Sequence, residues 1–569
     1  MKQRRGVSQI LFGFLPDQTA DLENAVWKVV EWSEPRYLPV DTDVLRRDLL
    51  RVTYPWTAVE ADDGLADALR SGVDIDVMSP SERGGVEVER FPEVYRCRSC
   101  GRVRLSNEGQ CQCGKRSWAQ MPFVAFHKCG RLEAPWIRRC SQHDDVMVKL
   151  PGSATTRDLK FECPICHTAI GGFAHLKCDC QYGGTVSYNM HRAAVVYTPR
   201  SMVVVNPPNS EVAAQLRASG AAEMVMAWVL EGMETRGPLD GKPSIDSLRA
   251  LFVGQGIDDA TAQVMAKAAA EQAGGAVTTE VSASVDLPDE AKAEAEEAAV
   301  KLAFAVAGGR TRLDDLARHA GPETVQRYEN LYRPAIATVR LVDVELLENF
   351  PVLTAVFGYT RGEAAAGSST LRWFRSKNGN AAVHGFKSDT EGLLFRLDPL
   401  AVVTWLERRG ILEQAATTAR KARLQILERC EIPRPGEVVD PPTAGSELLT
   451  LVHSLSHRII RRISAFSGVE RDALGEYLVP LHLAFVVFAS SRGDFVLGGL
   501  QALFEHDLDK ALRDVVRGES RCALDPGCTR HGGACVACLH VGEPTCRYYN
   551  QFLDRRALFG ADGLLAPDR

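Results

Sequence analysis

Three patterns that would assign a function directly are absent from this sequence. No stretch reaches the roughly 18 apolar residues of a membrane-spanning helix. No Gly-x4-Gly-Lys-Ser/Thr loop occurs, so the chain lacks the phosphate-binding motif of ATPases and helicases. The His-Glu-x2-His motif of zinc proteases is missing as well. We therefore expect a chain that is not itself an enzyme.

Charge of one sign is also lacking. The 569 residues carry a formal net charge of only −6, with 45% hydrophobic and 25% charged residues, as in ordinary soluble proteins. A short apolar run at residues 10–15 ends at Pro16 and Asp17, too early for a signal peptide. We expect a cytoplasmic protein of several domains that does not contact a membrane.

The residue patterns predict a multidomain α+β fold in four segments. Residues 1–90 form a mixed segment, 91–205 a tandem zinc-ribbon module, and 206–335 a helical, partly acidic region. Residues 336–569 form a C-terminal mixed α/β domain with a zinc site of four cysteines. Within it, apolar periodicity predicts a helix at 446–465 and a continuous apolar run predicts a buried strand at 483–488.

Cysteine is what the sequence has in excess. Ten of the 16 cysteines lie between Cys97 and Cys180, five lie between Cys522 and Cys546, and Cys430 stands alone. Cytoplasmic thiols stay reduced, so clustered cysteines indicate metal ligands rather than disulfides.

Two modules repeat the layout Cys-x2-Cys followed by Cys-x-Cys. Their cysteines are Cys97, Cys100, Cys111 and Cys113 in the first, and Cys163, Cys166, Cys178 and Cys180 in the second. Four thiolates suit tetrahedral Zn²⁺ and leave no open coordination position. The spacing therefore predicts two structural zinc ribbons.

The sequence does not decide which residues form two further groups of metal ligands. His127, Cys129, Cys140 and His143 form either a third zinc site or packing between the ribbons. Near the C-terminus we expect Cys528, Cys535, Cys538 and Cys546 to bind zinc, with Cys522 left over. Three to four structural zinc ions are predicted in total.

Residues 91–150 carry 11 Lys/Arg against five Asp/Glu, with aromatic residues interleaved. Basic groups beside aromatic platforms suit phosphate contacts and base stacking. The alternative is that the aromatic residues fill small cores and the charges are only solvated. The candidate DNA-binding residues are Arg102, Arg104, Lys115, Arg116, Arg138 and Arg139.

His453 and His457 lie on one edge of the predicted helix at 446–465. This spacing could hold a metal, but no carboxylate stands at helical spacing from both. We therefore favour packing for the two imidazoles. The neighbouring Arg458, Arg461 and Arg462 are predicted to face an acidic partner or phosphates.

The C-terminal residues resemble a zinc-binding domain that accompanies a class of superfamily 2 helicases. The resemblance rests on Cys535-Val536-Ala537-Cys538-Leu539, Cys546-Arg547-Tyr548-Tyr549-Asn550 and Leu553-Asp554-Arg555. Supporting pieces are His453-Ser454-Leu455-Ser456-His457, the strand at 483–488, Thr390-Glu391-Gly392-Leu393 and the opening at 4–9. This domain ends the MrfA-type repair helicases and also occurs separately, in the DrmB family of the DISARM antiphage system. The paired N-terminal ribbons are similar to the DrmB family.

The resemblance implies a DrmA-like helicase partner that supplies the ATP site, and DNA bound through the complex. It also implies antiviral defence in which a DNA methyltransferase marks host DNA. Two alternatives remain: a scaffold of an MrfA-like DNA repair complex, or a metal-dependent nuclease using His453 and His457.

Overall fold

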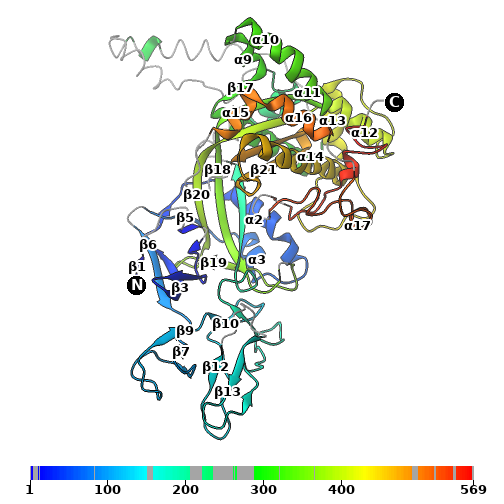
Figure 1. Ribbon diagram of the computed structural model, residues 1–569. Helices are drawn as coiled ribbons and strands as arrows, with labels where there is room; N and C mark the ends of the chain where they lie inside the picture. Colours follow the sequence, from blue (N-terminus) through cyan, green and yellow to red (C-terminus); the bar gives the residue numbers. More distant parts are fainter. Residues whose placement is uncertain are drawn as a thin grey trace. The chain divides into compact units, whose positions relative to one another are not determined.

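The chain is described by a computed structural model (Figure 1). The described residues are 2–3, 10–11, 13–81, 84–149, 158–205, 221–234, 261, 263–265, 287–319, 321–363, 365–489, 498–517, 521–542, 546 and 548–566. They belong to two compact units, Met1–Pro207 with Leu353–Lys387, and Pro208–Val352 with Ser388–Arg569. The four-segment division stays a prediction. The opening motif at residues 4–9 lies outside the described residues.

The first unit contains a four-stranded antiparallel sheet in the order β1-β6-β3-β2. Its strands are β1 (Lys2–Gln3), β6 (Gly85–Arg90), β3 (Ala25–Ser33) and β2 (Thr19–Leu22). Val29, Trp32, Val86 and Val88 are buried in one apolar cluster with residues of the longer strands. This cluster is the main core of the unit.

Helices and longer strands complete this part of the unit. Helix α2 (Thr42–Thr57) begins after Asp41, whose carboxylate accepts hydrogen bonds from the backbone N–H of Asp43 and Val44. Helix α3 (Leu65–Arg70) follows. Further strands are β4 (Arg36–Tyr37), β5 (Ile75–Ser79), β16 (Thr198–Val205) and β19 (Arg372–Arg375). Strands β18 (Leu341–Thr360) and β20 (Ala381–Leu397) contribute residues to both units.

Arg361 joins the cysteine-rich segment to this core. Its guanidinium is buried and donates hydrogen bonds to the backbone oxygens of Gly130, Val196 and Asp17 at 2.9, 2.6 and 2.9 Å. It also lies over the ring of Tyr359. Three carbonyl acceptors and an aromatic ring stabilise the buried guanidinium without a carboxylate. Because the three carbonyls belong to distant segments, this one side chain connects them.

The cysteine-rich segment contains three small antiparallel sheets instead of one core (Figure 1). The first has β7 (Tyr95–Cys97), β8 (Val103–Arg104) and β9 (Trp118–Gln120). The second has β10 (Phe123–Phe126), β11 (Leu132–Glu133) and β15 (Ser187–Met190). The third has β12 (Met147–Lys149), β13 (Lys160–Glu162) and β14 (Ala169–Ile170). Small apolar clusters lie among these strands: Val103, Phe123, Val148 and Phe161 are buried in one, and Val124 and Phe126 in another.

The second unit combines helices with a sheet. Its sheet contains β17 (Arg310–Arg312), β21 (Leu474–Val479) and β22 (Ala484–Ala489), beside parts of β18 and β20. Helices α5 (Ala221–Leu230), α8 (Asp289–Ala307), α9 (Leu313–His319), α10 (Pro322–Arg327) and α11 (Arg333–Thr338) come from the predicted helical region. The rest of that region, residues 206–220, 235–260, 262, 266–286 and 320, lies outside the described residues.

Helix α14 (Ala444–Ser467) runs through the core of the second unit (Figure 1). Thr443 and Ser446 form a capping box at its start, and Gly468 ends it in the left-handed conformation. The predicted helix at 446–465 and strand at 483–488 are confirmed by α14 and β22. The helix packs on β21, β22, α15 (Gly499–His506) and α16 (Leu508–Arg517).

The remaining elements of the second unit are α12 (Pro399–Arg408), α13 (Ala419–Arg429) and α17 (Gly527–Arg530). Among the residues that the structure describes, no helix is long and apolar enough to cross a membrane. The mixed α+β class predicted from the sequence, with cysteine clusters that could hold metal, is confirmed.

Candidate metal centres

Within the part of the chain that the structure describes, five groups of side chains bring their ligand atoms within 4.8 Å of one another. Three lie in the first unit and two in the second. We name them clusters A to E. They are A (Cys97, Cys100, Cys111, Cys113), B (His127, Cys129, Cys178, Cys180), C (Cys140, His143, Cys163, Cys166), D (Cys522, Cys528, Cys535, Cys538) and E (His453, His457, Glu476, Cys546).

The spacing of the sulfur atoms separates metal ligands from disulfides. The closest sulfur–sulfur pairs in clusters A to D are 3.4 Å apart for Cys522 and Cys535 and up to 3.8 Å apart for Cys140 and Cys166, and all ligand atoms of a cluster lie within 4.8 Å of one another. A disulfide requires about 2.05 Å. Tetrahedral zinc with sulfur at about 2.3 Å places the edges between ligands at roughly 3.8 Å. All 16 cysteines are free thiols, and the spacing within the clusters is that of a tetrahedral ligand set.

Cluster A is formed by two tight turns. Cys97 ends β7, and the N–H of Gly101 donates to the Cys97 carbonyl at 2.9 Å, which folds the first turn. The second turn closes when the N–H of Gly114 donates to the Cys111 carbonyl at 2.8 Å. Both glycines have positive φ angles, +79° and +81°, which other residues rarely adopt. The predicted grouping of these four cysteines agrees with the structure.

Backbone N–H groups favour the thiolate form of Cys97 within cluster A, whereas burial raises the pKa of Cys100 to about 12 and also raises that of Cys111. Burial raises the pKa of the Cys97 thiol, but hydrogen bonds from the backbone of Cys100 and Ser99 outweigh it and lower that pKa to about 6. The thiolate is the form that binds metal. The turn that places Cys97 therefore also favours its thiolate, the form that binds metal.

Cluster B lies at one end of an antiparallel strand pair. His127 follows β10, which pairs antiparallel with β15, so the segment before β15 returns beside His127 and Cys129. The Nδ1 atom of His127 lies 3.5 Å from the Cys180 sulfur, and the Cys129 and Cys178 sulfurs lie 3.8 Å apart. The ligand set is therefore three sulfurs and one imidazole nitrogen.

Cluster C is built around the β12–β13 pair. Cys163 follows β13, and the His143 Nδ1 atom lies 3.6 Å from the sulfurs of both Cys140 and Cys163. The hydroxyl and backbone of Thr168 lower the pKa of Cys166 to about 6. This cluster is also a three-sulfur, one-nitrogen set.

Clusters B and C correct two predictions. The second Cys-x2-Cys and Cys-x-Cys pairs do not share a site: Cys163 and Cys166 join cluster C, while Cys178 and Cys180 join cluster B. The third predicted group is also wrong, because His127 and Cys129 lie in B whereas Cys140 and His143 lie in C. The four pairs are nested along the chain. The antiparallel pairings β10–β15 and β12–β13 decide which pairs meet.

Cluster D surrounds α17 with cysteine sulfurs. Cys535 and Cys538 are 3.7 Å apart, and Cys522 and Cys528 complete the set. The prediction that Cys546 is a ligand here and Cys522 is left over is wrong. Asp525 holds the turn that carries Cys522, because its carboxylate accepts from the Cys522 N–H at 2.8 Å and from the Arg555 guanidinium at 2.6 Å.

Helix α14 supports cluster D with one side chain. The Arg461 guanidinium donates to the carbonyls of Val536, Ala537 and His540 at 3.3, 2.8 and 3.1 Å. This corrects the prediction for the helix arginines, because their guanidinium groups have partners within the protein. Arg458 donates to the carbonyl of Val515, and Arg462 pairs with Asp514.

Cluster E brings together residues that the sequence leaves apart. His453 and His457 come from α14, Glu476 from β21, and Cys546 from the C-terminal segment. All four are buried. The carboxylate missing at helical spacing is supplied by a strand, so no local motif could have identified Glu476.

Among the described residues, Cys430 is the cysteine that joins none of the five groups. Cys430 is buried at the end of α13, and burial raises its pKa to about 12. A buried thiol with a raised pKa is unreactive.

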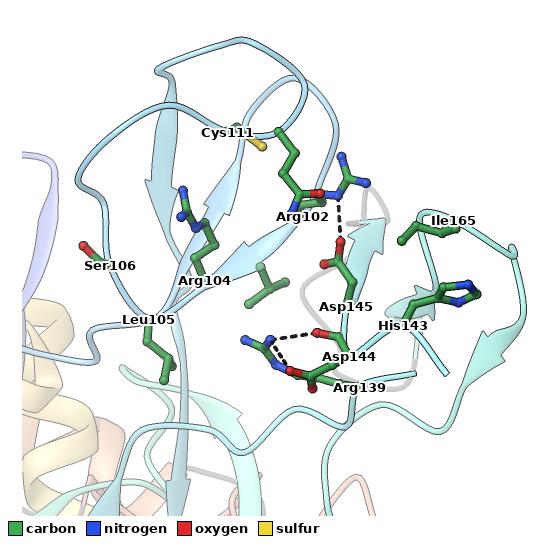
Figure 2. Close-up of a pocket in the computed structure, with 12 residues that line it drawn as sticks. Arg102, Arg104, Leu105, Ser106, Cys111, Arg139, His143, Asp144, Asp145 and Ile165 are labelled. Carbon is green, nitrogen blue, oxygen red and sulfur yellow. Dashed lines mark hydrogen bonds and ion pairs between the residues drawn. The ribbon is translucent and has the colours of Figure 1, made fainter. Parts of the chain in front are cut away.

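The candidate DNA-binding residues divide into two kinds. Figure 2 shows a cavity of about 400 Å³ with Arg102, Arg104 and Arg139 in its lining. Arg102 is mostly buried and pairs with Asp145 at 2.9 Å, so it stabilises the cavity wall. Arg139 donates to the backbone oxygen of Asp144 at 2.9 Å. Arg102 is therefore the weakest candidate. Arg139 is exposed, and Arg104 likewise has a partner within the protein, the Gln110 backbone oxygen at 3.2 Å.

The other candidates are exposed. Arg104 lies over the Trp118 ring at 5.3 Å, and Lys115 and Arg116 follow the second turn of cluster A. Arg138 is exposed near Trp136, whose side chain is 65% exposed. An exposed tryptophan beside exposed arginine offers both a stacking platform and charge.

Comparison with known proteins covers the first part of the chain. A family model described as "Domain of unknown function (DUF8724)" matches residues 6–193, the segment that carries clusters A, B and C. A search of the curated proteins found no match.

Proposed function

We propose that this protein is a non-catalytic zinc-binding subunit, similar to the DrmB family, that partners a DrmA-like superfamily 2 helicase. In this role it binds or senses foreign DNA in DISARM-type restriction of bacteriophage, with a DNA methyltransferase marking host DNA. The observation that carries the proposal is the cysteine-rich segment, where three ligand clusters hold short strands between exposed basic and aromatic side chains.

Zinc is the ion that fits clusters A to D best. Clusters A and D offer four sulfurs, and B and C offer three sulfurs and one nitrogen. Soft thiolate ligands in a tetrahedron select zinc among the common ions, and four protein ligands leave no position for water. The ions would therefore be structural, and their binding would supply folding free energy to sheets with little core.

DNA contact is supported by the side chains around clusters A and C. Arg104, Lys115, Arg116, Arg138 and Trp136 are exposed near the ligands. Lysine and arginine neutralise phosphates, and an exposed indole stacks on bases without sequence preference. A scaffold fixed by metal would hold these side chains on a rigid backbone, which lowers the entropy lost on binding.

The helicase partnership depends on the C-terminal resemblance. The matching residues surround clusters D and E, with Cys535 and Cys538 in the first and His453, His457 and Cys546 in the second. The sequence has no phosphate-binding loop of its own, so any ATP-driven action would require a partner.

The nuclease alternative is weakened by burial. His453 and His457 have no exposed surface, so a DNA phosphate could not reach them without rearrangement of the unit. A repair scaffold similar to the MrfA-type proteins uses the same features. Gene neighbourhood separates the two roles, because a helicase gene and a methyltransferase gene together favour defence.

A charge-reversal experiment tests the DNA interface. In the zinc-loaded full chain, Lys115→Glu, Arg116→Glu and Arg138→Glu together should weaken binding to a fluorescein-labelled single strand at least about tenfold. The slope of log affinity against log salt should fall by about two, since each phosphate contact contributes roughly 0.7. Fluorescence anisotropy measures both quantities.

The matched control reverses three exposed charges of the same unit outside the ribbons. These are Arg70, Arg375 and Lys377, whose side chains are 57%, 58% and 82% exposed. The control should bind as the wild type does. Equal weakening by both triple variants would show only a response to net charge and would contradict the ribbon interface.

Co-expression tests the partnership. The chain and the adjacent helicase should elute together at micromolar concentration, and DNA-stimulated ATP hydrolysis should require the helicase. Separate elution would contradict the proposed partnership. Metal-dependent DNA cleavage by the isolated chain, lost in His457→Ala, would support the nuclease alternative.

A further inference from the structure

We infer that cluster E binds a fifth metal ion, a divalent transition ion such as Zn²⁺, inside the second unit. Its ligands are His453 Nε2, His457 Nε2, one carboxylate oxygen of Glu476 and the sulfur of Cys546. This site differs from clusters A to D in ligand type and burial. It does not depend on the proposed DNA or helicase functions.

The ligand atoms converge on one point. The Oε1 atom of Glu476 lies 3.2 Å from His453 Nε2 and 3.3 Å from His457 Nε2. The Cys546 sulfur lies 3.2 Å from His453 Nε2. A tetrahedral ion with nitrogen or oxygen at about 2.0 Å places neighbouring ligands roughly 3.3 Å apart. The four atoms therefore have the separations of a ligand set around one ion.

The other nitrogen of each imidazole fixes the tautomer. His453 Nδ1 lies 3.2 Å from the backbone oxygen of Phe552, and His457 Nδ1 lies 3.0 Å from that of Leu539. A carbonyl oxygen only accepts, so both Nδ1 atoms carry the proton. In neutral imidazoles the Nε2 atoms then present lone pairs to the carboxylate and the sulfur. Metal-binding histidines usually have this arrangement, with the second nitrogen donating to a carbonyl.

A network held by protons alone must place charge or shared protons in a fully buried site. Without a metal, each Nε2 contact needs a proton from the imidazole, from the Glu476 carboxyl group or from the Cys546 thiol, and the two imidazole ring centroids are only 4.3 Å apart. Two adjacent imidazolium ions with one carboxylate would leave a net buried charge unless the thiol ionises as well. A divalent ion with two neutral imidazoles, one carboxylate and one thiolate gives a total charge of zero.

Hydrogen bonds from the surrounding protein orient two of the ligands. The Ser456 hydroxyl donates to the other carboxylate oxygen of Glu476 at 2.7 Å, which leaves Oε1 for the ion. The Asn550 backbone N–H donates to the Cys546 sulfur at 3.2 Å. Hydrogen bonds to thiolate and carboxylate ligands orient them toward the ion.

The site is closed, and this determines its role. His453 and His457 are 0% exposed, and Glu476 and Cys546 are each 3% exposed. With four protein ligands and no access for substrate, the ion would be structural. It would tie α14, β21 and the C-terminal segment together. Because His457 also contacts Leu539, beside Cys538, it would connect this core to cluster D.

Native mass spectrometry of the zinc-loaded wild-type chain counts the ions directly. We expect five zinc ions per chain, one for each cluster. Four ions, with clusters A to D loaded, would overturn the proposal. Because this measurement requires no substitution, it stays decisive even if a cluster E variant fails to fold.

Matched variants assign the fifth ion to cluster E. Glu476→Gln and Cys546→Ser should each retain four ions, while Cys430→Ser, a buried cysteine outside the clusters, should keep five. Cys528→Ser should also lose one ion, and the double variant Cys528→Ser/Glu476→Gln should retain three. A Glu476→Gln protein that is folded and still holds five ions would contradict the assignment.

Discussion

The two groups of metal-ligand clusters use opposite structural solutions. Clusters A, B and C lie beside strands of two to four residues, on turns closed by backbone hydrogen bonds, from glycine N–H groups in A and B and from Asp144 and His167 in C. Clusters D and E are held by side chains of α14, a helix buried in a large apolar core. In the first group the metal would add to several small apolar clusters. In the second it would fasten the C-terminal segment to a core that already exists.

Removal of the metal should produce the largest difference between the two groups of clusters, measured as hydrogen-exchange protection of the surrounding residues. Structural zinc in small modules contributes about 10–16 kcal/mol of apparent binding free energy. After chelation, hydrogen exchange should lose its protection throughout β7, β10 and β13, because little apolar area remains to fold them. The buried face of α14 should keep most of its protection. Equal loss in both regions would contradict the comparison, and added zinc should restore the ribbons.

The sequence predicts the ligands of a metal site correctly where they are local, and not where distant segments supply them. Cys97, Cys100, Cys111 and Cys113 could be grouped correctly because the ligands of cluster A lie within one local pair of turns. The nested clusters B and C could not, since strand pairing between distant segments sets their partners. Spacing within a pair is a local property, whereas the choice of partner pair is tertiary.

The C-terminal ligands show the limit more sharply. The helical spacing of His453 and His457 is compatible with a metal site, but Glu476 lies on a strand that reads as an ordinary buried segment. Cys546 follows Cys535 and Cys538 closely in the sequence, and this proximity led to the prediction that all three bind one ion. The fold instead turns Cys546 into the core and places Cys522 beside Cys535. The apolar patterns of α14 and β22 are enough to predict the elements, but not their contacts.

Gly101→Ala should destabilise the turn that carries Cys97 and Cys100 of cluster A, because the substitution strains the backbone there. A Cβ atom at Gly101 would lie 2.7 Å from the Val148 backbone oxygen, and the residue has a φ of +79°. The left-handed conformation costs about 1–2 kcal/mol and the clash adds about 1–3, so we expect about 3 kcal/mol of local destabilisation. Cluster A should then release its ion to a chromogenic chelator much faster than in the wild type.

Gly114→Ala is the matched control for that substitution. Its φ of +81° is nearly the same, but the nearest atom to a new Cβ is a side-chain nitrogen of Gln110 at 3.8 Å. Only the conformational cost of about 1–2 kcal/mol should remain. Equal release rates in the two variants would show that the close approach of Val148 does not hold cluster A.

Arg461→Ala should affect cluster D through a side chain of α14, with the smallest of these effects. It leaves the carbonyls of Val536, Ala537 and His540 without their shared donor, and hydrogen bonds to a charged group are worth about 1.5–3 kcal/mol. We expect one ion to be released roughly tenfold faster, while clusters A to C are unchanged. Arg462→Ala removes only a partly exposed pair with Asp514, worth about 0–1 kcal/mol, and should leave the release rate near that of the wild type. If both variants release the ion equally, α14 does not hold cluster D through Arg461, and the C-terminal clusters would depend on their own turns as the ribbons do.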